Sequence, residues 1–189
     1  VLQALEWAVA QRKTRNLSGF PNFVKVPPER MDEEAFAALE PEDQRSVVKE
    51  DKERKAANRE VNANKLNMSR TIKEAKELSE FEHFYLPHQW DFRGRVYHAS
   101  DFGHHTADYM RGLFLFANKA PIGENLVFLQ LQLANTWGND VDKASYEGRL
   151  QWVASMEKEI YEAGRDFEAG FDFWSKADDP FQFLAACNC

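Results

Sequence analysis

The most informative stretch of this 189-residue sequence is Tyr85-Leu86-Pro87-His88-Gln89-Trp90-Asp91-Phe92-Arg93-Gly94-Arg95-Val96-Tyr97. Its alternation of side chains predicts an extended strand, because successive side chains of a strand point to opposite faces. The polar face of this strand would carry Asp91, Arg93, Arg95 and Tyr97. The opposite face, which could enter a core, would consist of Trp90, Phe92, Gly94 and Val96.

The polar face suggests contact with a phosphate chain. Along a strand, Arg93 and Arg95 would be about 6.6 Å apart, which is similar to the spacing of neighbouring phosphates. Asp91 could hold one guanidinium in place, and Gly94, which lacks a Cβ, would let another backbone approach. The alternation by itself favours a simpler alternative, in which the strand is amphipathic and its Asp and Arg side chains pair in solvent.

The same residues resemble a motif of a known enzyme family. Asp91-Phe92-Arg93-Gly94-Arg95-Val96-Tyr97 is similar to an element of the single-subunit DNA-directed RNA polymerases of phages and mitochondria. Three more stretches resemble the family in its order: Arg111-Gly112-Leu113-Phe114-Leu115-Phe116-Ala117 with Pro121-Ile122-Gly123, Leu133-Ala134-Asn135 with Gly138, and Trp174 with Asp179-Pro180-Phe181-Gln182-Phe183-Leu184-Ala185. Ordered matches over about 100 residues are far more specific than one short motif.

Composition excludes several other classes of protein. Hydrophobic residues make up 43% and aromatic residues 13% of the chain, which excludes a disordered tail. No apolar run approaches the roughly 18 residues of a membrane helix, and a secretory signal pattern is absent. Cys187 and Cys189 are too close in sequence for a disulfide framework, which fits a reducing compartment. Because the chain starts at Val1 and ends at Cys189 inside an apolar run, we expect a piece of a longer protein.

Positive charge is concentrated in one stretch, although the net charge is -7. Residues 42–78 contain no Gly or Pro, which predicts one long helix, either unbroken or broken near Asn62–Asn67. Five basic side chains would share one arc of this helix: Arg45, Lys49, Lys52, Lys55 and Arg59. The stripe could follow phosphates, or it could belong to a solvated helix with the pairs Glu50–Arg54 and Asp51–Lys55.

Helices are expected over most of the remaining chain. The predicted helices are the end of a helix over residues 1–15, Glu33–Leu39, residues 106–117, a segment containing Leu126, Leu129, Leu133 and Trp137, Tyr146–Phe167, and a last helix that starts at Asp179-Pro180. Asp178 and Asp179 are interpreted as capping residues and not as metal ligands. His104 and His105 are adjacent and do not share a face, so a surface or loop-packing role is expected in place of a zinc site.

The resemblance implies a fold that is mainly α with a small β element (α+β). Residues 1–80 would form a thumb-like helical segment and residues 81–189 the first part of the palm of a right-hand polymerase. In the family, matching positions lie beside nucleic acid, so the expected nucleic-acid-binding residues are Arg93, Arg95, Tyr97, Gly94, Asp91, Lys52, Lys55 and Arg59. They would hold template DNA and the RNA–DNA hybrid through the backbone, without reading sequence.

The resemblance also implies what the chain lacks. In the intact enzyme Mg²⁺ would activate the reaction with nucleoside triphosphates, but its aspartate ligands follow this segment in the family. No catalytic or metal-binding residue is therefore expected here, and the segment alone should be inactive. The intact enzyme would be a monomer without a membrane partner, in the cytoplasm of an infected host or in an organellar matrix. The missing proline-rich pattern after Tyr97 favours a phage.

A second hypothesis comes from a different class of protein. The acidic net charge and the absence of a carboxylate site also fit a non-catalytic helical module that binds nucleic acid or protein. A self-contained phosphoryl-transfer enzyme is disfavoured, because the sequence has no Gly-rich phosphate loop and no His–carboxylate set at metal spacing.

Overall fold

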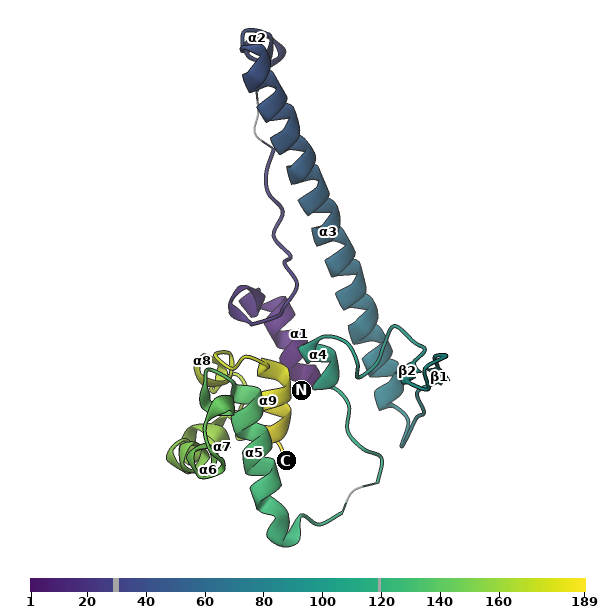
Figure 1. Ribbon diagram of the computed structural model, residues 1–189, viewed down its shortest axis with the longest axis vertical. Coiled ribbons are helices and arrows are strands. Elements are labelled where there is room, and N and C mark those ends of the chain that lie inside the picture. The colour runs from purple at the N-terminus through teal and green to yellow at the C-terminus, as the bar shows by residue number, and fades with distance from the viewer. Residues whose placement is uncertain (29–30, 119) are drawn as a thin grey trace. The chain divides into compact units, whose positions relative to one another are not determined.

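A computed structural model describes residues 1–28, 31–118 and 120–189 (Figure 1). The α-helices are α1 (Leu2–Ala10), α2 (Glu33–Ala37), α3 (Pro41–Ser79), α4 (Asp108–Arg111), α5 (Leu126–Trp137), α6 (Tyr146–Ser155), α7 (Glu157–Arg165), α8 (Phe171–Trp174) and α9 (Pro180–Cys187). Short 3₁₀ turns cover Lys13–Asn16, Gly123–Asn125 and Val141–Lys143. The strands β1 (His88–Trp90) and β2 (Val96–His98) form one two-stranded sheet. The predicted class, mainly α with a small β element, is confirmed.

Contacts divide the chain into two units, which are described separately. One consists of residues 1–20 with residues 71–189, and the other of residues 21–70. The expected assignment of residues 1–80 to a thumb and residues 81–189 to a palm stays a prediction. Within the described residues, no helix combines the length and apolar character that crossing a membrane requires.

The unit of residues 21–70 contains α2 and most of α3. Asp32 caps α2, because its Oδ1 accepts a hydrogen bond of 2.7 Å from the backbone N–H of Ala35. The expected helix at Glu33–Leu39 is thus confirmed, although it ends at Ala37. Asn58 of α3 holds an extended segment through two hydrogen bonds to Val26. Its Oδ1 accepts from the N–H of Val26, and its Nδ2 donates to the carbonyl of Val26, both at 2.9 Å.

The long helix α3 is continuous, so the alternative with a break near Asn62–Asn67 is wrong. Asparagine weakens a helix when its side chain competes for nearby backbone groups. Here the amide of Asn64 instead donates to the carbonyl of Asn22, at 3.3 Å. The side chain bonds a neighbouring segment, and the hydrogen bonds of the helix are left intact.

Helix α9 lies at the centre of the other unit, where it packs against α4, α5, α7 and α8 (Figure 1). Its side chains Phe181, Phe183 and Leu184 are fully buried, as is Trp174 of α8. Burying side chains of this size stabilises the fold by about 1.5–3 kcal/mol each. The expected start of this helix is confirmed, with Asp179 at the N-cap and Pro180 in the first turn.

An aromatic cluster joins four helices of this unit. The indole of Trp137, at the end of α5, stacks on Phe173 with ring centroids 4.8 Å apart. The same ring contacts Trp152 of α6 at 5.0 Å and Phe183 of α9 at 5.3 Å. The helical interpretation of residues around Leu126–Trp137 is thus confirmed, since the helix carries Trp137 into this cluster.

The predicted single helix over Tyr146–Phe167 is wrong, because the chain forms α6 and α7 with a break at Met156. Met156 leaves helical geometry, with φ -108° and ψ 14°. The hydroxyl of Ser155 donates to the carbonyl of Trp152 at 2.7 Å, a bond that competes with the helical pattern. Of the expected core residues here, Val153 and Ile160 are buried, whereas Tyr161 is exposed.

The predicted helix over residues 106–117 is also wrong beyond its first turn, since α4 ends at Arg111. At Gly112, an added Cβ would lie 2.7 Å from the carbonyl oxygen of Phe181. The chain therefore passes against the backbone of α9 at this glycine. This tertiary contact, which local propensity does not encode, accompanies the end of the helix.

Asp108 binds the amino-terminal end of α9. Its carboxylate accepts hydrogen bonds from the backbone N–H groups of Phe181, at 2.8 Å, and Gln182, at 3.0 Å. The predicted capping side chain, Asp179, makes no such bond, so the cap comes from a distant segment. Burial raises the pKa of Asp108, while the two N–H groups act in the opposite direction.

We predict that Asp108→Ala destabilises the chain by about 1–3 kcal/mol, because two buried N–H groups of α9 lose their acceptor. Asp108→Asn should cost clearly less, since its amide oxygen still accepts a hydrogen bond. Urea unfolding measures the difference, with Asp101→Ala, at an exposed position nearby, as the matched control. Equal stability of Asp108→Ala and the unmodified chain would contradict this role.

Candidate nucleic-acid interface

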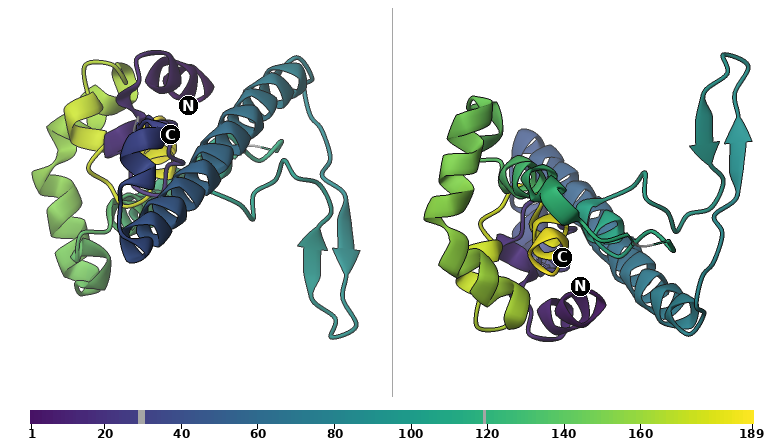
Figure 2. Two further views of the ribbon diagram at one scale, coloured as in Figure 1. Left: turned by 90° about the horizontal axis from the view of Figure 1, so that it is seen from above. Right: turned by 90° about the horizontal axis from the view of Figure 1, so that it is seen from below.

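The predicted strand over Tyr85–Tyr97 is wrong, because the chain turns back within it. Strands β1 and β2 pair in antiparallel register, with His88 opposite His98, Gln89 opposite Tyr97, and Trp90 opposite Val96. Both views in Figure 2 show this hairpin extending away from the helices α5–α9 of its own unit. Arg93 and Arg95 therefore lie in a tight turn and not on one face of a strand.

The carboxylate of Asp91 organises this turn. Its Oδ1 accepts hydrogen bonds from the backbone N–H of Arg93, at 2.8 Å, and from that of Arg95, at 2.9 Å. The backbone closes the turn as well, since the N–H of Asp91 donates to the carbonyl of Arg95 at 2.9 Å. Aspartate suits this position because its short side chain reaches N–H groups two residues further along.

Asp91 also holds the side chain of Arg93. Its Oδ2 accepts from Nε of Arg93 at 3.1 Å and lies 3.0 Å from Nη2. The pKa of Asp91 is lowered, first by the N–H of Arg95, with further contributions from Arg93 and the side chain of Tyr97. The expectation that Asp91 fixes one guanidinium is confirmed, and Arg93 is the residue it holds.

Arg95 remains available for an outside partner. Its side chain is exposed and makes no ion pair or hydrogen bond with residues 1–28, 31–118 or 120–189. Its backbone, in contrast, is bonded to Asp91 at both the N–H and the carbonyl. A free cation therefore stands on a fixed main chain, an arrangement that lowers the entropy lost on binding an anion.

Gly94 serves the turn itself. Its φ is +77°, a conformation that residues with a Cβ rarely adopt. An added Cβ would meet no heavy atom within 4 Å among the described residues, so the space beside Gly94 is open and its positive φ is what favours glycine within this chain. The expected approach of another backbone at Gly94 stays a prediction.

The expected apolar face does not enter a core of this chain. Trp90 is 75% exposed and Phe92 is 96% exposed, at the tip of the hairpin. Tyr97 is 39% exposed on β2. The guanidinium of Arg93 lies over the Phe92 ring, with 5.5 Å between its Cζ and the ring centroid. Sequence reasoning thus missed Trp90 and Phe92 as surface residues, although Asp91-Phe92-Arg93-Gly94 is a recognisable turn signal.

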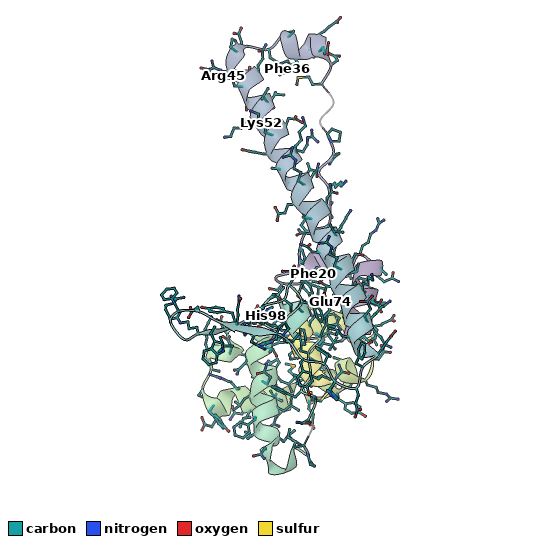
Figure 3. The ribbon with its side chains drawn as sticks, turned by 90° about the vertical axis from the view of Figure 1, so that its right-hand side faces the viewer. Phe20, Phe36, Arg45, Lys52, Glu74 and His98 are labelled. Carbon is teal, nitrogen blue, oxygen red and sulfur yellow. The ribbon has the colours of Figure 1, made fainter. Side chains whose placement is uncertain are left out.

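The basic stripe lies on α3, in the unit of residues 21–70, and all five of its members are exposed. Figure 3 shows Arg45 and Lys52 projecting from the same side of this helix. Two members are already paired: Lys49 with Glu53 at 4.0 Å, and Lys55 with Asp51 at 2.6 Å. Lys52 and Arg59 form no ion pair with any residue that the structure describes.

The two ion pairs expected on the solvated side of α3 have different outcomes. The pair Asp51–Lys55 is confirmed. The pair Glu50–Arg54 is wrong, because Arg54 bonds Asp51, which is one residue closer in sequence, and Glu50 accepts from the hydroxyl of Ser46. Pairs of this exposed kind contribute little stability, about 0–1 kcal/mol.

The acidic pair Asp178-Asp179 forms no metal centre with neighbouring side chains. The Oδ2 of Asp178 accepts from the backbone N–H of Asn139 at 2.9 Å and so supports the turn after α5. Within the described parts of the chain, no group of three or more His, Cys, Asp or Glu side chains is placed to hold a metal ion. The residues here therefore do not fit the Mg²⁺ site of a polymerase.

Comparison with known proteins relates the chain to RNA polymerases. Residues 120–188 match the family described as DNA-dependent RNA polymerase. The chain is 35% identical over 135 residues to the mitochondrial DNA-directed RNA polymerase 1 of Nicotiana sylvestris. The matched residues make up 70% of this chain and 14% of that protein.

Two further relatives give the same result. Identity is 34% over 162 residues to the mitochondrial DNA-directed RNA polymerase 1 of Arabidopsis thaliana, covering 85% of this chain and 16% of that protein. It is 34% over 135 residues to the chloroplastic DNA-directed RNA polymerase 3B of Nicotiana tabacum, covering 70% and 14%. The chain therefore spans only a small part of the length of these relatives.

We predict that Asp91→Ala abolishes the protection of the Arg93 and Arg95 amides, measured by NMR hydrogen exchange. Asp91→Asn should retain it, because its amide oxygen still accepts both hydrogen bonds. Because the pKa of Asp91 is lowered, its stabilisation of the turn is fully present above the ordinary aspartate pKa. This stabilisation is lost only as pH falls below that pKa. Protection should thus be constant from pH 7 to about 4. A loss of protection near pH 6 would contradict this account.

Proposed function

Because the chain belongs to the family of single-subunit DNA-directed RNA polymerases, we propose that it forms part of the surface that holds template DNA and the RNA–DNA hybrid in such an enzyme. The parent enzyme would join nucleoside triphosphates with the help of Mg²⁺ bound by residues outside this segment. We assign no catalytic residue to residues 1–189. The intact enzyme would act as a monomer.

The observation that carries this proposal is the free guanidinium of Arg95 on a turn ordered by Asp91. An arginine fork can donate two parallel hydrogen bonds to a phosphate group. Arg93, partly neutralised by Asp91, would then support the turn and add a weaker contact. Contacts of this kind position a nucleic-acid backbone and carry no sequence information.

The exposed aromatic side chains beside Arg95 fit the same partner. Trp90 and Phe92 lie at the hairpin tip, and Tyr97 follows on β2. Aromatic rings next to cationic groups bind single-stranded nucleic acid through base stacking, which tolerates any sequence. A polymerase template must be held in this sequence-independent manner, because every base has to pass the same surface.

The stripe on α3 would contribute a second set of phosphate contacts. Lys52 and Arg59 are free, and Lys55 would have to exchange its pair with Asp51 for a phosphate. Counterion release makes each such contact visible in the salt dependence of binding. The positive charge and the exposure of the stripe support these contacts.

A second candidate function is a helical module that binds another protein. The observation that favours it is the exposed apolar tip of the hairpin, since Phe92 and Trp90 could also fill a pocket of a partner. The two functions differ in their response to salt. Binding through phosphates weakens steeply as salt rises, whereas docking of apolar side chains does not.

The proposed location is an organellar matrix or, for a phage enzyme, the cytoplasm of the infected cell. The names of the relatives, which are mitochondrial and chloroplastic polymerases of plants, support the organellar alternative. The missing proline-rich pattern after Tyr97 supports the phage alternative.

We predict that Arg95→Ala in the intact polymerase weakens binding to a template–hybrid scaffold by roughly tenfold to a hundredfold, the range of about 1.5–3 kcal/mol for one hydrogen bond to a charged group. The slope of log affinity against log salt should fall by about 0.7–0.9, the value for one phosphate contact. Arg165→Ala, at an exposed arginine on α7, is the control. Unchanged affinity and slope in Arg95→Ala would remove this residue from the proposed surface.

On α3 we predict that Lys52→Ala lowers the salt slope more than Lys55→Ala does. Lys52 is free, whereas Lys55 must first give up Asp51, so its net gain from a phosphate is smaller. Filter-binding titrations of the intact polymerase at several salt concentrations measure both slopes. Equal slopes for both variants and the unmodified enzyme would show that the stripe is a solvated helix face.

A further inference from the structure

Four of the five histidines meet at the base of the hairpin, a cluster formed by His88, His98, His104 and His105. His88 and His98 are opposite each other on β1 and β2 (His98 is labelled in Figure 3). The ring of His104 lies 5.8 Å from each of these rings, between centroids. His105 adds contacts of 4.2 Å to His104 and 5.1 Å to His98.

The packing around His98 is close. An added Cβ at Gly103 would lie 2.3–2.6 Å from three atoms of the His98 ring, so the loop backbone is pressed against this imidazole. The Nδ1 of His98 is buried and has no hydrogen-bond partner in the described chain. Phe102, next in sequence to Gly103, is buried and packs on Phe114, which anchors the loop to its unit.

The charged and titratable groups that face His104 are other histidines. They are His88 from β1, His98 from β2 and His105 from the loop. Phe114 supplies an uncharged edge contact at 6.3 Å. Among the residues that the structure describes, no carboxylate forms an ion pair with any member of the cluster. His88 is bonded only to a neutral group, the carbonyl of Leu86, at 2.8 Å.

We propose that the histidine cluster is a pH-sensitive latch, which holds the hairpin on residues 99–107 while its imidazoles are neutral and releases it when they are protonated. Two imidazolium charges about 5 Å apart in water repel each other enough to change an equilibrium constant about fourfold. The Nδ1 of His98 is buried without a hydrogen-bond partner among the described residues, so this ring offers the cluster no bond that would offset such a repulsion.

The direction of the pH response follows from the histidine pKa. His104 is exposed, and partial loss of its hydration together with the neighbouring imidazoles lowers its pKa. The released chain therefore binds protons more readily than the latched one. The latch contributes its full stability above the ordinary histidine pKa of about 6.5 and loses it as pH falls below that value.

The latch bears on nucleic-acid binding only if the proposed function holds. The hairpin contacts the loop of residues 99–107 at its base, where the histidines lie, whereas Asp91 and Arg95 lie at its tip. Release at low pH would leave the turn itself intact, because the lowered pKa of Asp91 keeps its carboxylate charged there. The hairpin would then present Arg95 with less orientational order.

The test is hydrogen–deuterium exchange of the intact protein without nucleic acid, so that its outcome does not depend on template binding. Mass spectrometry follows the backbone amides of residues 85–107 and the C2–H of each imidazole. After correction for intrinsic rates, amide exchange in β1, in β2 and in residues 99–107 should rise about fourfold or more between pH 7.5 and 5.5, whereas the amides of Arg93 and Arg95 at the tip should stay protected. His104 should take up its proton at lower pH than the same residue in the unfolded chain.

Three variants complete the test. His104→Gln removes the central imidazole and should reduce the pH-dependent rise. If this variant already exchanges fast at pH 7.5, His105→Gln serves in its place and should also reduce the rise. Gly103→Ala should displace the His98 ring and raise exchange at both pH values. The control His83→Gln alters the histidine outside the cluster and should behave as the unmodified protein. An unmodified hairpin without the rise, or the same rise in both cluster variants, would overturn the proposal.

Discussion

The Asp91 carboxylate accepts two backbone N–H groups and one guanidinium, and the form of the hairpin tip depends on this set of bonds. One oxygen orders the main chain of the turn, while the other holds Arg93. Arg95 is thereby left with a fixed backbone and a free side chain. Without this carboxylate the turn would still carry both arginines, but the Arg93 side chain would lose its ion pair and the N–H of Arg95 would lose its acceptor.

The same chemical device recurs in the core. Asp108 binds two N–H groups at the start of α9, just as Asp91 binds two in the turn. At the surface, Asp178 accepts one such N–H group, that of Asn139 in the turn after α5. Each carboxylate supplies an acceptor where the backbone has N–H groups without a regular partner. The burial of Phe181, Phe183 and Leu184 then keeps α9 in place.

Local sequence patterns predicted the elements whose causes are local. The absence of Gly and Pro predicted α3, and Asp179-Pro180 predicted the start of α9. The alternation at Tyr85–Tyr97 does not distinguish one strand from a hairpin, because the flanks of a hairpin alternate as one strand does, and only the Asp91–Gly94 turn signal separates the two. The break at Met156 and the end of α4 at Arg111 depend on packing and on side-chain bonds, which propensity does not describe.

Within the candidate site, the residue types were predicted but not their arrangement. The sequence indicated that Asp91 could hold an arginine, yet the exposure of Trp90 and Phe92 followed only from the turn. The histidine cluster was missed because adjacent residues were judged by themselves. His88 and His98 join His104 only through the antiparallel register, which the strand interpretation could not supply.

The most direct test of the account is a crosslinking measurement at the hairpin tip. A photoreactive amino acid replaces Phe92, which is almost fully exposed, in the intact polymerase bound to a template–hybrid scaffold. Our account predicts a crosslink to the nucleic acid that disappears when Asp91→Ala is added, because the turn no longer presents its tip in a fixed position. Crosslinks to protein alone, with none to either nucleic-acid strand, would contradict it.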